Sequence, residues 1–325
     1  MNLVLNTYGT SLSKENNSFV IIHKDGRQMI PPDHIKSITI SKGASITSDA
    51  ALMAIENSIE VLFVDFSGMP VGRLWSVKYG SISTIRRNQL DFTLSENAVA
   101  WIKKIIMQKI DNQAALLYSL MPDNFDNKAK INASINRLND YRKKISKLTG
   151  NAVADIAPSL RGWEGAASKI YFETIGVFLP DDYKFSLRSQ HPALDIFNCL
   201  LNYAYGMLYG KIEGALIKAG IDPYVGIFHR DDYNRPVLVF DIIEIFRVWV
   251  DYVVFSLCMQ KAINEDCYSV KPDGSYWLEA LGRRILIQSF NDYLAEIINM
   301  NGLDRSRAMH IELYAQNLAQ MFLKN

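Results

Sequence analysis

The chain has 325 residues, 49% of them hydrophobic, so it is long enough for two domains that each bury a core. A formal net charge of +1 gives no overall field, so a polyanion would have to be held by local basic patches. Three cysteines without CxxC spacing argue against a disulfide framework and a thiolate zinc site, and fit a reducing cytoplasm. The longest hydrophobic runs are interrupted by charges, which predicts neither a signal peptide nor a membrane span.

Short hydrophobic runs separated by turn residues predict a small N-terminal β domain over residues 1–84. Ser48 and Asp49 can cap one short helix within it, because hydrophobic residues follow them at helical spacing. The expected strands cover residues 3–7, 19–23, 37–41, 59–64 and 71–75.

From Ser83 onward glycine and proline become rare, and hydrophobic residues recur three and four positions apart, as in Ala98, Ile102 and Ile105. This spacing predicts a larger all-α domain over residues 85–325, and therefore an α+β fold class. Residues 179–191 are expected to form a long loop. The expected helices cover residues 96–118, 128–148, 164–177, 193–219, 237–259, 275–299 and 305–323.

Two carboxylates, Asp241 and Glu244, lie three residues apart on the helix that follows Pro236. Their neighbours are strongly hydrophobic, and a buried carboxylate needs a compensating cation. One interpretation is a structural ion pair between Glu244 and Arg247. The other is a bound metal ion.

Two further residues extend the second interpretation. His229 lies just before the carboxylate helix, after Gly226 has allowed a close backbone approach. Glu164 stands between two glycines at the expected start of a helix. Each has an ordinary alternative, a surface histidine and a glutamate that complements the helix dipole. Together with Glu244 they suggest a Glu, His, Glu centre, whose donors suit Mg²⁺ or Mn²⁺ better than a structural zinc.

Polar residues elsewhere suggest supporting roles. Asn198, Asn202 and Tyr205 share one face of a hydrophobic helix, where they either join helices or orient the site carboxylates. Basic residues gather on the helix over residues 128–148 and in further pairs elsewhere in the chain, such as Arg86-Arg87. A basic run is often only a solvated face, but beside a metal site it becomes a track for DNA phosphates. The phosphate-binding candidates in these groups are Arg86, Arg87, Lys143 and Lys144.

Four segments occur in an order and spacing that resemble the CRISPR-associated spacer integrase and endonuclease family, "Cas one". They are Glu-Gly-Ala-Ala-Ser-Lys-Ile-Tyr-Phe from Glu164, Asn-x-x-Leu-Asn-Tyr-x-Tyr from Asn198, Gly-x-x-His ending at His229, and Phe-Asp-x-x-Glu-x-x-Arg ending at Arg247. Residues 61–74 and the Arg86-Arg87-x-Gln89 segment are also similar to that family.

The resemblance implies that Glu164, His229 and Glu244 are catalytic metal ligands, with Asp241 nearby and Arg247 placed to meet a DNA phosphate. It implies an Mg²⁺- or Mn²⁺-dependent transesterification, in which the 3′-hydroxyl of a short foreign DNA attacks a CRISPR array, and a nuclease activity when water replaces the hydroxyl. The family often has aspartate where this chain has Glu244.

The resemblance also implies double-stranded and branched DNA as substrates, and a homodimer formed through the β domains. Two such dimers would flank a dimer of the small partner "Cas two" in a heterohexamer, in the cytoplasm and away from membranes. Two alternatives stay open from the residues alone. One is a generic metal-dependent DNA nuclease, and the other is a non-catalytic DNA-binding scaffold in which the carboxylates are only ion-paired.

Overall fold

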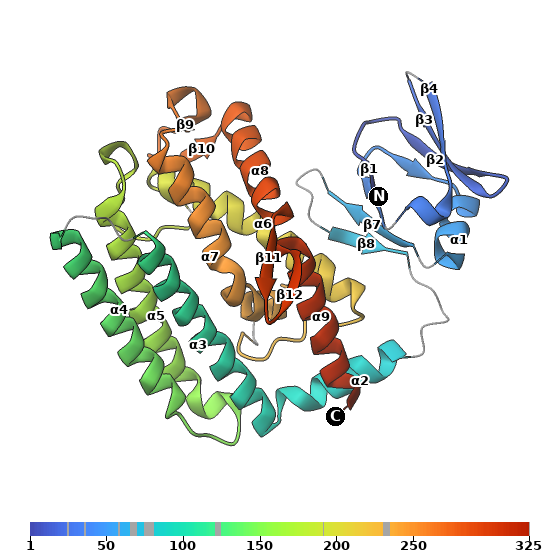
Figure 1. Cartoon of the computed structure of the whole chain (residues 1–325). Helices are drawn as coiled ribbons and strands as arrows, with labels where there is room; N and C mark the ends of the chain where they lie inside the picture. The colour runs from blue at the N-terminus through green and yellow to red at the C-terminus, as the bar shows by residue number, and fades with distance from the viewer. Residues whose placement is uncertain are drawn as a thin grey trace. The chain divides into compact units, whose positions relative to one another are not determined.

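The computed structural model describes residues 1–24, 26–35, 37–57, 59–65, 70–74, 81–120, 125–190, 192–229 and 235–324. The chain divides into two compact units, Met1–Ser83 and Thr84–Asn325, one residue away from the boundary expected at 84/85. Strands dominate the first unit and helices the second (Figure 1), which confirms the α+β fold class.

The first unit contains two sheets. In the first sheet the neighbouring strands are parallel except the last pair, and its order is β1 (Asn2–Leu5), β5 (Ser37–Ser41), β7 (Glu60–Val64) and β8 (Pro70–Arg73). The order of the second sheet is β4 (Gly26–Ile30), β3 (Ser18–His23), β2 (Ser11–Glu15) and β6 (Ser45–Ile46). Strands β2, β4 and β6 were not expected, because they are short and mostly polar. Part of the strand expected over residues 71–75 lies outside the described residues.

The helix of this unit, α1 (Ser48–Glu56), begins after Thr47, whose hydroxyl accepts the N–H of Ala50 at 3.3 Å. Ser48 and Asp49 therefore occupy the first turn instead of the cap position that the sequence suggested. The unit buries its own core, in which Leu12, Phe19 and Ile38 are almost fully inaccessible to solvent. Buried residues alternate with partly buried ones along β5, which gives this sheet one face on that core.

The second unit is a helical assembly in which α3 packs against α4, α5 and α7, and α6 packs against α7 and α9. Helices α3, α4 and α5 run side by side in Figure 1. The helices are α2 (Ser81–Thr93), which crosses the unit boundary, α3 (Glu96–Ser119), α4 (Phe125–Ser146), α5 (Val153–Phe178), α6 (Ile196–Lys218), α7 (Val237–Met259), α8 (Ala280–Ala295) and α9 (Arg307–Lys324).

Short elements connect these helices, and two of them replace the ends of the helix expected over residues 275–299. They are the hairpins β9 (Tyr268–Val270) with β10 (Tyr276–Leu278) and β11 (Ile297–Met300) with β12 (Leu303–Ser306), and the 3₁₀ turns η2 (Asp181–Tyr183) and η3 (Glu265–Cys267). A further 3₁₀ turn, η1 (Pro32–His34), lies in the first unit between β4 and β5. Within the described residues, we find no helix with the length and hydrophobicity that crossing a membrane requires.

Helix α5 corrects one expectation that bears on function. It begins at Val153, so Glu164 lies about three turns inside the helix and not at its start. Pro158 lacks an N–H, and a proline usually lies in the first turn of a helix and not in its interior. The helix nevertheless runs through it, because Ile156 and Leu160 on either side are buried in the core. The explanation of Glu164 as a complement to the helix dipole is therefore wrong.

Candidate active site

Three helices bring a carboxylate pair and a lysine together. The ammonium of Lys109 on α3 contacts Glu164 Oε1 on α5 and lies 2.6 Å from Glu244 Oε2 on α7. Ser168, one turn after Glu164, donates a hydrogen bond to the same Oε1 at 2.9 Å. The side chains of Lys109 and Glu244 are only 8% and 9% exposed, and that of Glu164 is 25% exposed. Lys109 thus compensates part of the negative charge of the two carboxylates inside the protein, and Glu164 is the more solvent-exposed of the two.

Arg247 provides a second cation for Glu244, with Nε 2.9 Å from Oε1. This is the ion pair that the sequence left open as the ordinary interpretation. Burial alone would raise the pKa of Glu244, but the charges of Arg247 and Lys109 outweigh burial and hold that pKa at about 2. Burial acts to lower the pKa of Lys109, but Glu244 and Glu164 raise it above its ordinary value. Glu244 and Lys109 are therefore both charged at neutral pH.

His229 forms a separate pair with Asp241, one turn before Glu244 on α7. His229 Nδ1 lies 2.7 Å from Asp241 Oδ1, and the imidazole is 41% exposed. Asp241 is fully buried and also accepts the backbone N–H groups of Ile227, Phe228 and His229 at 2.8, 3.0 and 3.2 Å. With Nδ1 directed at this carboxylate, Nε2 is the nitrogen left for a ligand.

The loop that carries His229 is fixed from several sides. A Cβ at Gly226 would lie 2.1 Å from the carbonyl oxygen of His229, so only glycine permits the close approach that the sequence suggested. Arg161 donates to the carbonyl oxygen of Phe228 at 3.3 Å, and its guanidinium lies 5.0 Å from the centre of that ring. Gln89 on α2 donates to the carbonyl oxygens of Asp222 and Val225 at 2.8 and 3.1 Å. We did not assign Arg161, Gln89, Lys109 or Ser168 a role from the sequence.

The amide pair on α6 serves the preceding loop. Asn198 and Asn202 accept hydrogen bonds from Arg188 at 2.7 and 2.6 Å, and Asn202 also donates to the carbonyl oxygen of Gln190 at 2.6 Å. The structure thus ties these amides to the preceding loop and not to another helix, and none of their described hydrogen bonds reaches Glu164 or Glu244.

Tyr205 is connected to the site indirectly. Its ring lies 4.7 Å from the guanidinium of Arg247, and its hydroxyl donates to Asp251, as the Tyr171 hydroxyl does at 2.8 Å. Burial raises the pKa of Asp251 to about 6. This buried network packs against the guanidinium of Arg247, which in turn pairs with Glu244.

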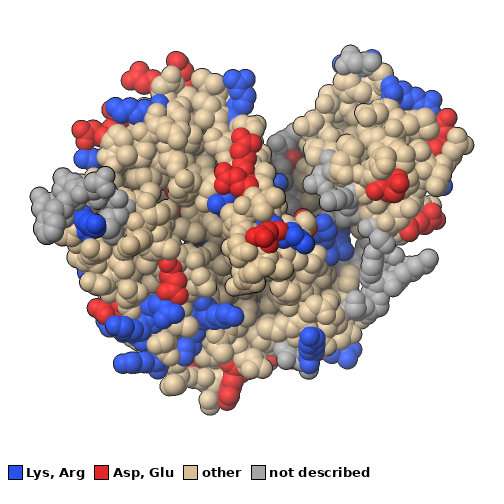
Figure 2. Space-filling view, viewed as in Figure 1, with Lys and Arg blue, Asp and Glu red and all other residues tan. Residues whose placement is uncertain are grey.

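The expected phosphate-binding residues lie on the surface. Arg86 and Arg87 are exposed on α2, and Lys143 and Lys144 are exposed near the end of α4, where Lys143 is 3.9 Å from Asp140. Figure 2 shows lysine and arginine side chains gathered over the region where α4 ends. Arg247 differs from them, because Glu244 already engages its Nε.

The ligand set of Glu164, His229 and Glu244 stays a prediction. Within the described part of the chain, no three or more His, Cys, Asp and Glu side chains are grouped as a metal ion would require. Glu164 and Glu244 nevertheless converge on one cation, the Lys109 ammonium. Their oxygens are the hard donors that Mg²⁺ and Mn²⁺ prefer, so the donor set fits such an ion.

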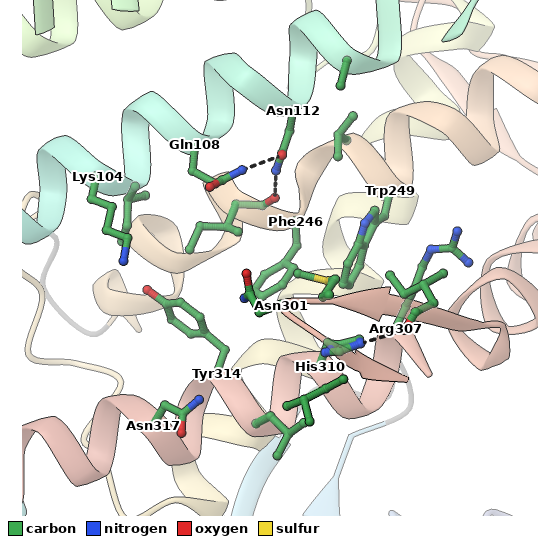
Figure 3. A pocket seen from close by; sticks show the side chains of 18 of the residues that line it. Lys104, Gln108, Asn112, Phe246, Trp249, Asn301, Arg307, His310, Tyr314 and Asn317 are labelled. Carbon is green, nitrogen blue, oxygen red and sulfur yellow. Dashed lines mark hydrogen bonds between the residues drawn. The ribbon is translucent and has the colours of Figure 1, made fainter. Parts of the chain in front are cut away.

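An open cavity of about 1090 Å³ lies on another side of α3 and α7 and is also lined by α9 and the β11–β12 hairpin. Figure 3 shows Trp249, Tyr314, His310 and Asn112 directed toward it. Gln108 and Ile245 also line it, but their neighbours in sequence, Lys109 and Glu244, do not, nor do Glu164 and His229. The cavity is therefore separate from the ionic cluster.

Comparison with known proteins identifies the family. The sequence profile of the family described as "CRISPR associated protein Cas1" matches residues 3–292. The chain belongs to the Cas1 family. A "CRISPR-associated endonuclease Cas1 1" from Archaeoglobus fulgidus is 30% identical over 332 residues, covering 98% of this chain and 95% of the relative. The resemblance inferred from the four motifs is confirmed.

Solved structures agree in fold. A casposase bound to its integration product superposes with a TM-score of 0.73 at 22% identity, covering 100% of this chain and 96% of that one. A chain of a partial Cas6-RT-Cas1–Cas2 complex gives a TM-score of 0.74 at 23% identity, with 100% of this chain and 96% of that one covered. At these identities the likeness concerns the fold. The Cas1 profile ends at residue 292, so β11, β12 and α9, which line the cavity, lie beyond it.

Proposed function

We propose that the protein is a divalent-metal-dependent DNA integrase and endonuclease that inserts short foreign DNA into a CRISPR array. Membership of the Cas1 family supports this proposal, together with a relative named as an endonuclease and a structural neighbour bound to an integration product. The observation that carries it is the convergence of Glu164 and Glu244 on one cation, one helical turn from the Asp241–His229 pair.

Glu164, Glu244 and Nε2 of His229 would hold the Mg²⁺ or Mn²⁺ ion. When bound, the ion supplies Lewis-acid polarisation of the target phosphodiester and stabilises its developing negative charge. Asp241 fixes the orientation of the imidazole through Nδ1, and the Ser168 hydroxyl orients Glu164. These contacts preorganise the donors, which lowers the cost of gathering them around a charged substrate.

The reaction exchanges one phosphodiester bond for another. The 3′-hydroxyl oxygen of the incoming DNA bonds to the target phosphorus and loses its proton, while the bond to the departing 3′-oxygen breaks and that oxygen gains a proton. Water in place of the hydroxyl gives hydrolysis, and the reverse reaction on a branched DNA gives disintegration. One site therefore accounts for both integrase and nuclease activity.

DNA would be held by local patches, because the net charge of +1 provides no general attraction. We assign phosphate contacts to Arg86, Arg87, Lys143 and Lys144, and a contact nearer the site to Arg247. Binding that depends on such contacts weakens steeply as salt is added.

For the assembly, we propose a homodimer formed through the β units and a heterohexamer with a Cas2 dimer in the cytoplasm. The neighbour solved within a Cas1–Cas2 complex supports the Cas2 partner. Light scattering at micromolar concentration tests the dimer. A monomeric mass would exclude it.

The deciding experiment is Mn²⁺-dependent strand transfer on a branched, half-integrated DNA. It compares the wild-type protein with His229→Ala, and with His34→Ala as a control for an exposed histidine in the β unit. We expect metal-dependent rejoining that is lost in His229→Ala and in chelator, and kept in His34→Ala. Cleavage without preference for branched DNA would favour the generic nuclease. DNA binding without turnover in any variant would favour the non-catalytic scaffold, for which the ion-paired Glu244 is the supporting observation.

A further inference from the structure

Lys109 occupies the point at which the two carboxylates of the candidate site meet. Its ammonium contacts Glu164 and lies 2.6 Å from Glu244, and its side chain is 8% exposed. Lysine is rarely buried unless it is paired, so this position is specified by the two carboxylates. A cation bound between Glu164 and Glu244 would have to take the place of the ammonium or share the carboxylates with it.

The charges of the cluster already cancel. Glu164 and Glu244 contribute two negative charges, and Lys109 and Arg247 contribute two positive charges. A divalent ion added to this set would leave two uncompensated positive charges in a largely buried site, which is costly. If the Lys109 side chain swings away and one DNA phosphate arrives, the sum with the ion returns to zero.

We propose that the Lys109 ammonium occupies the position of the divalent cation in the free protein. There it compensates the negative charge of the two carboxylates and weakens metal binding until DNA arrives. Lys109 acts on the site through Glu164 and Glu244 and is a positioning residue. The inference rests on the proposed function, because it assumes that this carboxylate pair receives the metal. If the inference holds, Lys109 of α3 sets the affinity of the free protein for the metal ion.

The test measures Mn²⁺ binding to the full-length protein, with free Mn²⁺ followed by electron paramagnetic resonance. Lys109→Met removes the charge and keeps most of the hydrophobic stem. Lys104→Met is the matched control, because Lys104 is exposed on the same helix and lines the separate cavity. Lys109→Gln is a second neutral variant that can still donate to the carboxylates, in case the methionine variant does not fold. Each titration is repeated with a branched DNA in excess.

Without DNA, we expect Lys109→Met and Lys109→Gln to bind Mn²⁺ at least tenfold more tightly than the wild type, with Lys104→Met unchanged. DNA should tighten binding to the wild type and have a smaller effect on the Lys109 variants. Adding Glu164→Gln should abolish the tightened binding, which locates the ion at this pair.

Two results would overturn the inference, and they are distinguishable. If the wild type and the Lys109 variants bind Mn²⁺ equally, Lys109 is only a structural counter-ion or a DNA contact, and the proposed function stands. If no variant binds Mn²⁺ with or without DNA, the metal site itself is wrong and the proposed function fails with it. Melting temperatures with and without Mn²⁺ give an independent reading, since the ion should restore stability lost in Lys109→Met.

Discussion

Replacing Asp241 with asparagine tests how the histidine loop is held. Asp241 Oδ2 accepts the N–H groups of Ile227 and Phe228, and Oδ1 accepts from the N–H and faces Nδ1 of His229. In asparagine one of these oxygens becomes an NH₂ group. In place of Oδ2 it would face two N–H donors, and two hydrogen bonds are lost. In place of Oδ1 it would face the N–H of His229 and Nδ1, which accepts from it when the ring proton is on Nε2, so at least one hydrogen bond is lost. At about 1.5 kcal/mol each, the cost is about 1.5 to 3 kcal/mol of unfolding free energy.

Urea unfolding of Asp241→Asn at neutral pH, followed by circular dichroism, measures this cost. Asp140→Asn is the control, because Asp140 is exposed on α4 and its only described ion pair is 3.9 Å long, so it should change stability by less than about 0.5 kcal/mol. We also expect strand transfer to fall in Asp241→Asn while DNA binding stays unchanged, since the imidazole loses its orientation. A stability loss below about 1 kcal/mol would refute the view that Asp241 anchors residues 227–229.

Three further predictions concern stability and DNA binding. Burial raises the pKa of Glu213 from 4.5 to about 6. At pH 7.5 the ionised side chain therefore lowers the free energy of unfolding by about 2 kcal/mol, and this penalty disappears as the pH falls through 6 to below 4.5. Glu213→Gln should therefore raise the melting temperature at pH 7.5 and match the wild type at pH 4.5; equal melting temperatures at both pH values would contradict this. Gly226→Ala should lower the free energy of unfolding in urea by at least about 1 kcal/mol. Gly165→Ala is the control, because its Cβ would meet no described atom within 4 Å, and it should stabilise α5 by up to about 1 kcal/mol. Similar effects of the two changes would count against the close approach at Gly226. Lys144→Ala should weaken binding to all DNA sequences alike and reduce the salt slope by about 1, as measured by fluorescence anisotropy, and an unchanged slope would remove α4 from the DNA interface.

Regular hydrophobic spacing made much of the helical unit predictable. The helix expected over residues 237–259 is α7 with the same bounds, and α3 extends only one residue beyond its expected end. Helix α5 was less predictable, because Pro158 is a local signal that burial of its neighbours overrides. The hairpins β9–β10 and β11–β12 were missed, because each strand is only three or four residues long.

The site was predictable only in part, because a sequence shows which residues carry charge but not which charges meet. Lys109 left one signal that we did not use. It follows Ile105 and Ile106 by four and three residues and precedes Ile110, so it lies on the buried face of α3. A charged residue on such a face requires a partner, but the two helices that provide the partners begin far along the chain. The partner of Asn198 was equally hidden, since Arg188 comes from a loop.

Asp241 and Glu244 show why two acidic residues one helical turn apart do not share a role. The short side chain of Asp241 meets the backbone of an incoming loop, and three N–H dipoles with one imidazole compensate its charge. Glu244, one turn later, faces α3, and the full charges of Lys109 and Arg247 compensate it. Dipoles fixed by the fold stay in place when a substrate arrives, whereas a lysine side chain is free to move once a better cation is present. Within one turn of α7, the first carboxylate is therefore suited to hold the histidine in position and the second to exchange one cation for another.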